Sequence, residues 1–166
     1  IYKSRNNFKV CVLNLMGNVF MKKCDDVFEV SKKFLLNKKL KQDYDFLIVD
    51  FHGEITSEKM AIGHFFDGKA TLVVGTHTHV PTNDSRILQN GTGYQTDAGM
   101  CGDYDSVIGM DKNNSLNRFL KKESQKHFPA KGVATLCGVI VDGNEKNGLA
   151  YNIENFIYGG ELKNSQ

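Results

Sequence analysis

The sequence predicts one mixed α/β domain in which parallel strands come first and antiparallel strands follow. The first observation behind this prediction is a strand–helix–strand pattern, because residues 45–51 and 70–74 are nearly continuous apolar runs with a helical pattern between them. The second is a change after residue 84, where short apolar runs alternate with turns that contain Gly and Asn. The third is size, since 166 residues with 40% hydrophobic content suit a single core.

The first half of the chain supplies the parallel strands. Residues 8–15 form a short apolar run that is typical of an interior strand. Residues 25–40 then carry apolar side chains at three- and four-residue intervals, behind two aspartates that favour a helix N-terminus. A second helix is predicted over 56–66. Because a right-handed crossover returns the chain to the same sheet, strands 45–51 and 70–74 are predicted to be parallel neighbours.

The second half is predicted to pair antiparallel, because its strands are short and its turns are rich in Gly and Asn. A helix is predicted over residues 115–126, with apolar side chains on one side and charged ones on the other. The predicted strands of this half are residues 85–88, 93–96, 132–141 and 149–157.

Composition excludes several classes of function. The net charge is only +2, and the lysine cluster over 32–41 lacks interleaved aromatic side chains, so it is interpreted as a solvated helix face and not as a nucleic-acid surface. No run reaches the roughly 18 apolar residues of a membrane span. The four cysteines show no Cys-x-x-Cys spacing and are predicted to be reduced packing residues. A cytoplasmic location and no membrane partner are therefore expected.

Three histidines follow the two central strands directly. His52 comes after residues 45–51, and His77 and His79 come after residues 70–74. Because ligands bind at the carboxyl edge of parallel sheets, and the crossover brings these two loops together, we expect the three imidazoles to bind metal. The His-x-His spacing of His77 and His79 is interpreted as a dinuclear site in which each histidine binds its own ion.

Other polar residues near these histidines receive more modest predictions. Asp50 and Glu54 flank His52, and we expect them to orient an imidazole N–H and not to bind the metal themselves. Asp97 stands beside turn glycines and is interpreted as organising a turn, with a place in the site as the alternative. His64 and His127 are interpreted as ordinary polar residues.

Several segments together resemble the YmdB-like branch of the calcineurin-type metallophosphoesterases. The similarity runs through most of the chain. The segments that carry it are Val49-Asp50-Phe51-His52-Gly53-Glu54, Ser57-Glu58-Lys59, Val73-Val74-Gly75-Thr76-His77-Thr78-His79-Val80, Thr96-Asp97-Ala98-Gly99-Met100-Cys101-Gly102 and Tyr104-Asp105-Ser106-Val107-Ile108-Gly109-Met110.

The resemblance implies a four-layer α/β sandwich that hydrolyses phosphodiesters, with 2′,3′-cyclic nucleotides as the associated substrates. It implies two metal ions, with His52 and His77 on one and His79 on the other, and a bridging hydroxide that attacks phosphorus. Iron and manganese are the metals it implies, and imidazole ligands also suit zinc.

The resemblance also implies that residues 1–166 are the C-terminal portion of a single metallophosphoesterase domain. Family members carry further ligands and the bridging and acid residues in an N-terminal half, so that half is an expected partner and the catalytic residues of this chain stay unknown. Two alternatives remain open: a non-catalytic regulatory module that binds metal, and a mononuclear zinc hydrolase that uses all three histidines. The sequence does not determine the oligomeric state, and a homo-oligomer is one of the open alternatives.

Overall fold

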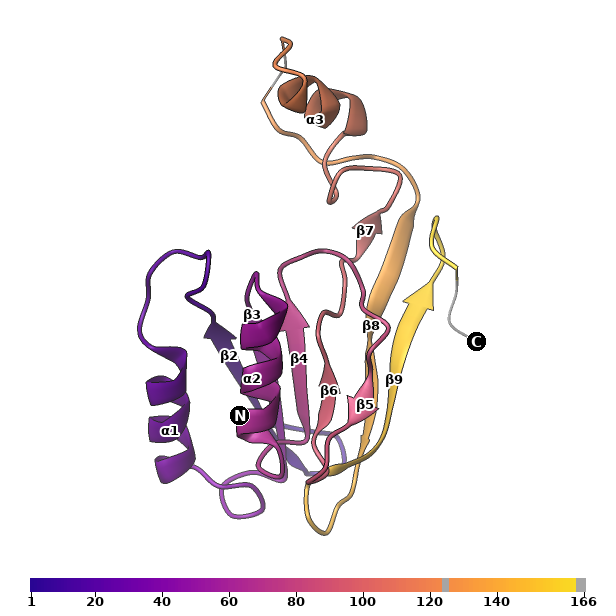
Figure 1. The fold of residues 1–166 in the computed structure, drawn as a ribbon. Coiled ribbons are helices and arrows are strands. Elements are labelled where there is room, and N and C mark those ends of the chain that lie inside the picture. Colours follow the sequence, from indigo (N-terminus) through magenta and orange to yellow (C-terminus); the bar gives the residue numbers. More distant parts are fainter. Residues whose placement is uncertain (124–125, 164–166) are drawn as a thin grey trace.

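A six-stranded sheet and a three-stranded sheet organise the computed structural model, which describes residues 1–123 and 126–163 (Figure 1). The strand order is β1-β2-β3-β4-β6-β5 in the larger sheet and β7-β8-β9 in the smaller one. The mixed α/β class, with parallel strands followed by antiparallel ones, is confirmed. The strands are β1 (Tyr2–Lys3), β2 (Lys9–Met16), β3 (Phe46–His52), β4 (Leu72–Thr76), β5 (Arg86–Ile87), β6 (Gly93–Gln95), β7 (Gly102–Asp103), β8 (Ala134–Gly143) and β9 (Ala150–Tyr158).

Two helices, α1 (Val27–Asn37) and α2 (Thr56–Phe66), pack on the larger sheet (Figure 1). The Asp26 side chain begins α1 by accepting hydrogen bonds from two backbone N–H groups of the first turn. Ile62 and Phe66 of α2 are fully buried. Each such side chain contributes about 1.5–3 kcal/mol when it leaves water. The buried cluster lies between these helices and the sheet.

Alternation along β3 decides which side chains reach this core. Leu47, Val49 and Phe51 have no exposed surface and join the core cluster. Successive side chains of a strand point to opposite faces, so Asp50 and His52 lie on the other face, where they are only partly buried. The same strand therefore anchors the sheet with one set of residues and presents polar groups with the other.

The predicted crossover is confirmed, because β3 and β4 pair in parallel through α2. One pairing prediction is wrong: the sequence predicts β6 among antiparallel strands, yet it pairs in parallel with β4 and antiparallel only with β5. The two-residue strands β1 and β7 are additions that the sequence pattern does not predict.

The predicted third helix starts three residues early, because Asp111 caps α3 (Lys112–Phe119) by accepting from Asn114 N–H. The predicted end at residue 126 is wrong for residues 120–123, because α3 ends at Phe119, and residues 124–125 lie outside the described residues.

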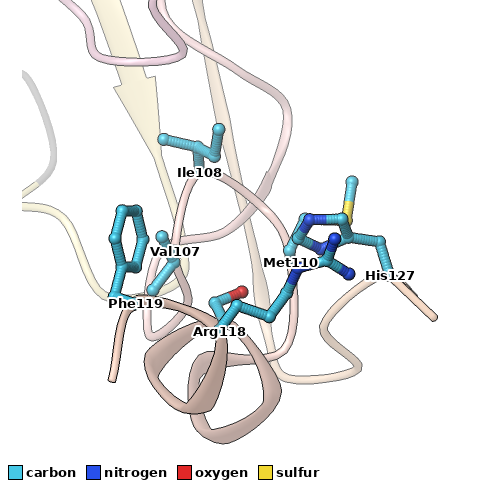
Figure 2. Close-up of a pocket in the computed structure, with 7 residues that line it drawn as sticks. Val107, Ile108, Met110, Arg118, Phe119 and His127 are labelled. Atoms are coloured by element: carbon cyan, nitrogen blue, oxygen red, sulfur yellow. The ribbon is translucent and has the colours of Figure 1, made fainter. Parts of the chain in front are cut away.

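The hairpin of β8 and β9 supplies the antiparallel layer. Ile153 and Ala150 of β9 lie against Gly93 of β6, where an added Cβ would meet both side chains at 3.3–3.4 Å. Beyond the carboxyl ends of the parallel strands, α3 stands apart from the sheets (Figure 1). A pocket lies between α3 and the loop over 107–110 (Figure 2).

All four cysteines are free, as predicted. Cys11 and Cys137 are buried, whereas Cys24 and Cys101 are exposed, so the predicted packing role is wrong for the second pair. Within residues 1–123 and 126–163, no helix is both long and apolar enough to cross a membrane.

Candidate metal centre at the edge of the parallel sheet

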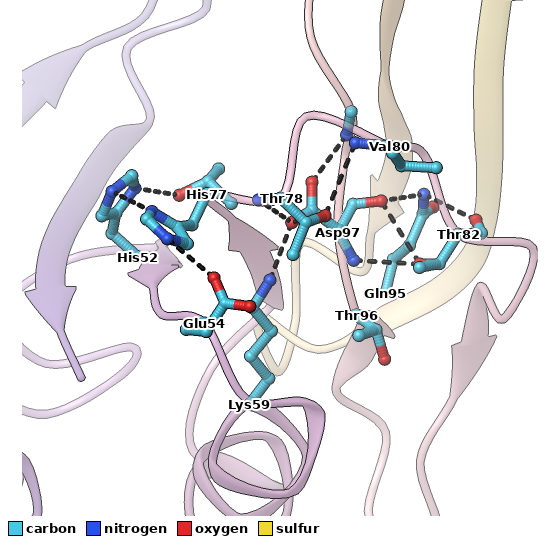
Figure 3. Close-up of polar contacts among 12 residues, drawn as sticks. His52, Glu54, Lys59, His77, Thr78, Val80, Thr82, Gln95, Thr96 and Asp97 are labelled. Carbon is cyan, nitrogen blue, oxygen red and sulfur yellow. Dashed lines mark hydrogen bonds and ion pairs between the residues drawn. The ribbon is translucent and has the colours of Figure 1, made fainter. Parts of the chain in front are cut away.

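Two of the three predicted histidines meet at the carboxyl ends of β3 and β4. His52 is the last residue of β3 and pairs in register with Thr76, the last residue of β4. The next residue after Thr76 is His77, which therefore lies close to His52. His52 Nε2 lies 3.0 Å from His77 Nδ1. The two rings meet edge to face, with centroids 4.7 Å apart (Figure 3). The parallel pairing therefore brings together residues that are 25 positions apart.

A hydrogen-bond chain fixes the tautomer of His52. The Thr76 hydroxyl donates to Asp50 Oδ1 over 2.9 Å, since an ionised carboxylate can only accept. A hydroxyl has one hydrogen, so the 3.0 Å contact between His52 Nδ1 and Thr76 Oγ1 must be donated by the histidine. His52 Nε2 is then left with its lone pair free for a ligand, as in a metal-binding imidazole.

His77 has a comparable arrangement with a different carboxylate. Its Nε2 lies 2.9 Å from Glu54 Oε2, which accepts the ring proton. In the neutral ring, the Nδ1 of His77 then carries a lone pair that faces the lone pair of His52 Nε2. Two such lone pairs at 3.0 Å need a proton or a cation near them. Of the two acidic residues expected to orient imidazoles, Asp50 acts on His52 through Thr76 and Glu54 contacts His77.

The separation of the two nitrogens fits a pair of neighbouring metal ligands. Imidazole nitrogens bind ions at about 2.1 Å, and two of them at right angles around one ion lie about 3.0 Å apart. His52 and His77 therefore match the donor type and the spacing of a metal site. No group of three or more His, Cys, Asp or Glu side chains able to hold an ion is present within residues 1–123 and 126–163.

His79 makes a different contact. Its Nδ1–H donates to the Ile108 carbonyl over 2.9 Å, which leaves Nε2 with the lone pair of the neutral ring. The loop bends sharply here, with positive φ angles of 110° at His77 and 67° at His79. Such backbone strain in residues other than glycine is concentrated at functional sites. The third predicted ligand thus shares the loop, and its metal-binding role stays a prediction.

A buried ion pair holds this loop in place. Lys59 of α2 and Asp97 lie 2.7 Å apart, and their side chains are 0% and 1% exposed. Asp97 also accepts hydrogen bonds from the backbone N–H and the hydroxyl of Thr78, between the two histidines (Figure 3). Burial raises the pKa of Asp97, but the hydrogen bonds from Lys59, Gly99 and Thr78 outweigh it, so this pKa lies below its ordinary value.

The role of Asp97 can be predicted in part from the sequence, whereas that of Lys59 is not predicted above. Asp97 does organise a turn, because Gly99 N–H donates to it, and it also reaches the histidine loop. Lys59 is a residue that the sequence analysis does not single out for the site. A signal exists, since Lys59 stands three and seven positions before the buried Ile62 and Phe66 and thus faces the core.

A glycine allows the end of β4 to pack against the strand beside it. A Cβ added to Gly75 would lie 1.8 Å from the carbonyl oxygen of Thr96, which is far inside the contact distance of any two atoms. Only glycine fits a backbone approach this close. Gly75 therefore allows the strand that leads to His77 to reach its position.

The chain matches one family model and is similar to several known proteins. The family described as YmdB-like protein matches residues 1–156. The 2′,3′-cyclic-nucleotide 2′-phosphodiesterase of Bacillus subtilis (strain 168) is 40% identical over 156 residues, covering 94% of this chain and 58% of that protein. The chain spans about half the length of the curated relatives it matches.

Two solved structures superpose on most of the chain. A crystal structure of a hypothetical protein from Thermus thermophilus superposes with a TM-score of 0.84 at 37% identity, covering 93% of this chain and 59% of the other. A crystal structure titled as a novel phosphatase from Mycoplasma pneumoniae superposes with a TM-score of 0.79, also at 37% identity, covering 89% of this chain and 52% of the other.

Proposed function

The chain belongs to the YmdB-like protein family, and on that premise we propose that it carries part of the metal centre of a phosphodiesterase that acts on 2′,3′-cyclic nucleotides. The observation that carries the proposal is the pair His52 and His77, whose facing nitrogens are 3.0 Å apart. The name of the Bacillus subtilis relative supports the substrate class. As part of this proposal, residues 1–166 are the C-terminal portion of one metallophosphoesterase domain, and the remaining ligands lie in an N-terminal half.

The proposed roles follow from the contacts of each side chain. His52 and His77 bind one ion through Nε2 and Nδ1, while Thr76 and Asp50 keep the proton of His52 on the opposite nitrogen. Glu54 holds the proton of His77 on Nε2. His79, in the same loop, binds the second ion. Iron and manganese are the proposed metals.

The metal ions, when bound, lower the pKa of a water and neutralise charge on the phosphoryl oxygens. The protein's own contribution is orientation. The buried Lys59–Asp97 pair fixes Thr78, so the two histidines beside it keep their directions before any substrate arrives. Preorganised groups of this kind cost no rearrangement at the moment of reaction.

The test uses the protein of complete natural length, purified without chelator. Metal content is measured by elemental analysis, and hydrolysis is measured on 2′,3′-cyclic AMP. We expect His77→Ala and His52→Ala to lose bound metal and to lower kcat/KM by more than about 100-fold. His64→Ala is the matched control, because His64 is an exposed histidine of α2, and it should keep both metal and activity.

The outcomes separate the proposal from its alternatives. Stoichiometric metal with no turnover on any phosphodiester would contradict the proposal and favour a regulatory module. One zinc per chain that requires His52, His77 and His79 together would favour the mononuclear hydrolase. Full activity of His77→Ala would refute the proposed metal centre.

A further inference from the structure

The pocket beside α3 is not used by the metal centre described above. Its cavity measures about 500 Å³, and its walls include Val107, Ile108, Met110 and Phe119. We propose that this pocket binds the heteroaromatic base of the nucleotide whose phosphodiester is cleaved. This inference rests on the proposed function and names a binding site for one part of the substrate.

The size and lining of the pocket suit a flat, largely apolar ring. Small-molecule sites measure about 300–1,000 Å³ and combine apolar walls with a few polar groups. Figure 2 shows Phe119 and Val107 on one side of this pocket and Met110 with His127 on the other. Phe119 is 80% exposed, so its ring is available to stack on a base.

A buried hydroxyl group supplies the polar contact that such a site needs. Ser115 lines the pocket, is only 3% exposed, and its Oγ has no hydrogen-bond partner in the described part of the chain. Buried polar atoms are nearly always paired, so an orphan that borders a cavity indicates a ligand atom. A hydroxyl both donates and accepts, which matches the ring nitrogens and exocyclic groups at the edge of a base.

The planar guanidinium of Arg118 also lines the pocket. Arginine stacks on aromatic rings as well as donating hydrogen bonds, and this combination is common where proteins hold unpaired bases. An aliphatic lipid chain would gain nothing from the Ser115 hydroxyl. The mixture of Phe119, Arg118 and Ser115 therefore favours a base over a purely apolar occupant.

The pocket is joined directly to the loop of the metal centre. Ile108, which forms part of its wall, accepts the hydrogen bond from His79 Nδ1 through its carbonyl. The backbone is in the left-handed region at Ile108, with φ 49°, so the wall is held in a strained conformation. Tyr104 adds a second link, because its hydroxyl donates to the His79 carbonyl over 3.0 Å. A ligand in the pocket therefore lies against the wall residue that His79 contacts.

The first test measures binding without chemistry. The protein of complete natural length, treated with chelator, is titrated with 2-aminopurine riboside, whose fluorescence reports stacking. We expect the 2-aminopurine riboside to bind saturably, and we expect adenosine, but not ribose, to displace it. Ser115→Ala should weaken binding about tenfold, the effect of losing one hydrogen bond. Phe119→Ala should weaken it by a similar factor. Leu120→Ala is the matched control, because Leu120 is exposed and does not line the pocket.

The second test compares two substrates with the same reacting group. They are 2′,3′-cyclic AMP and methyl riboside 2′,3′-cyclic phosphate, which lacks a base. We expect Phe119→Ala to raise KM about tenfold for the first and to leave the second unchanged. Equal effects on both substrates, or no binding of the base analogue, would overturn the inference while leaving hydrolysis intact. Absence of hydrolysis by the wild type would instead refute the proposed function, and the binding test would still decide the pocket.

Discussion

Replacing Asp97 by asparagine should be the most damaging single-atom change near the metal centre. Asp97 accepts from Lys59 and Thr78 through one oxygen and from Gly99 through the other. An asparagine amide has only one carbonyl oxygen, so either orientation turns an NH₂ group toward donors. The substitution also leaves the ammonium of Lys59, which is fully buried, without its counter-charge.

The expected cost follows from the depth of this pair. Removing one partner of a buried ion pair costs about 3–5 kcal/mol, because the other charge stays buried and unpaired. At roughly 2–4 °C per kcal/mol for a chain of this size, Asp97→Asn should lower Tm by roughly 6–20 °C. Lys59→Met should cost less, since Asp97 keeps the hydrogen bonds from Thr78 and Gly99.

Urea unfolding of both variants measures these differences. Glu29→Gln is the control, because the Glu29–Lys32 pair is more than half exposed and should contribute nothing measurable. The reasoning is refuted if Asp97→Asn unfolds within about 1 kcal/mol of the wild type, or if Lys59→Met costs more than Asp97→Asn.

The same pair predicts a dependence on pH. The pKa of Asp97 is lower in the folded protein than in the unfolded chain, so its contribution is present above the unfolded pKa of about 3.9. It is lost as the pH falls through the lower folded value. The unfolding free energies of wild type and Asp97→Asn should therefore approach each other below about pH 4, and parallel curves would contradict this.

Three further predictions concern nearby residues. Thr76→Val removes the hydroxyl between Asp50 and His52 and should weaken metal binding about 10–100-fold in chelator competition, with no comparable loss of stability. Gly75→Ala should give little soluble protein, because its Cβ would overlap the backbone beside β4; normal circular dichroism would disprove this. Burial raises the pKa of Asp84, yet its hydrogen bonds outweigh burial and lower it, so Asp84→Asn should reduce the stability lost below about pH 4 in acid titration.

Strand-level patterns predict much of the fold because burial leaves a recognisable pattern in short segments. The apolar run that forms β3 predicts an interior strand, and the crossover rule predicts its parallel neighbour. The direction of β6 is not predictable in this way. A strand of three residues carries no local sign of its direction, which its pairing with β4 decides.

The site shows the same division between local and tertiary information. His52 can be located because it ends a recognisable strand, and its proximity to His77 follows from the register of β3 and β4. The direction of the His79 side chain cannot be predicted from the sequence, because it depends on the positive φ angles of two non-glycine residues. Nothing in residue type alone requires a histidine to adopt that conformation.

Strain and burial in this loop are linked. Residues such as His77 and His79 with positive φ angles cost about 1–3 kcal/mol each, so the loop would relax if nothing opposed it. What opposes it is the Lys59–Asp97 pair, whose carboxylate accepts charge-assisted hydrogen bonds from both the backbone and the side chain of Thr78. A surface pair could not do this, because water would compete for every bond. The buried Lys59 of α2 therefore connects the histidine loop, through Asp97, to the stable core. This connection fixes the direction of each histidine at the edge of the sheet.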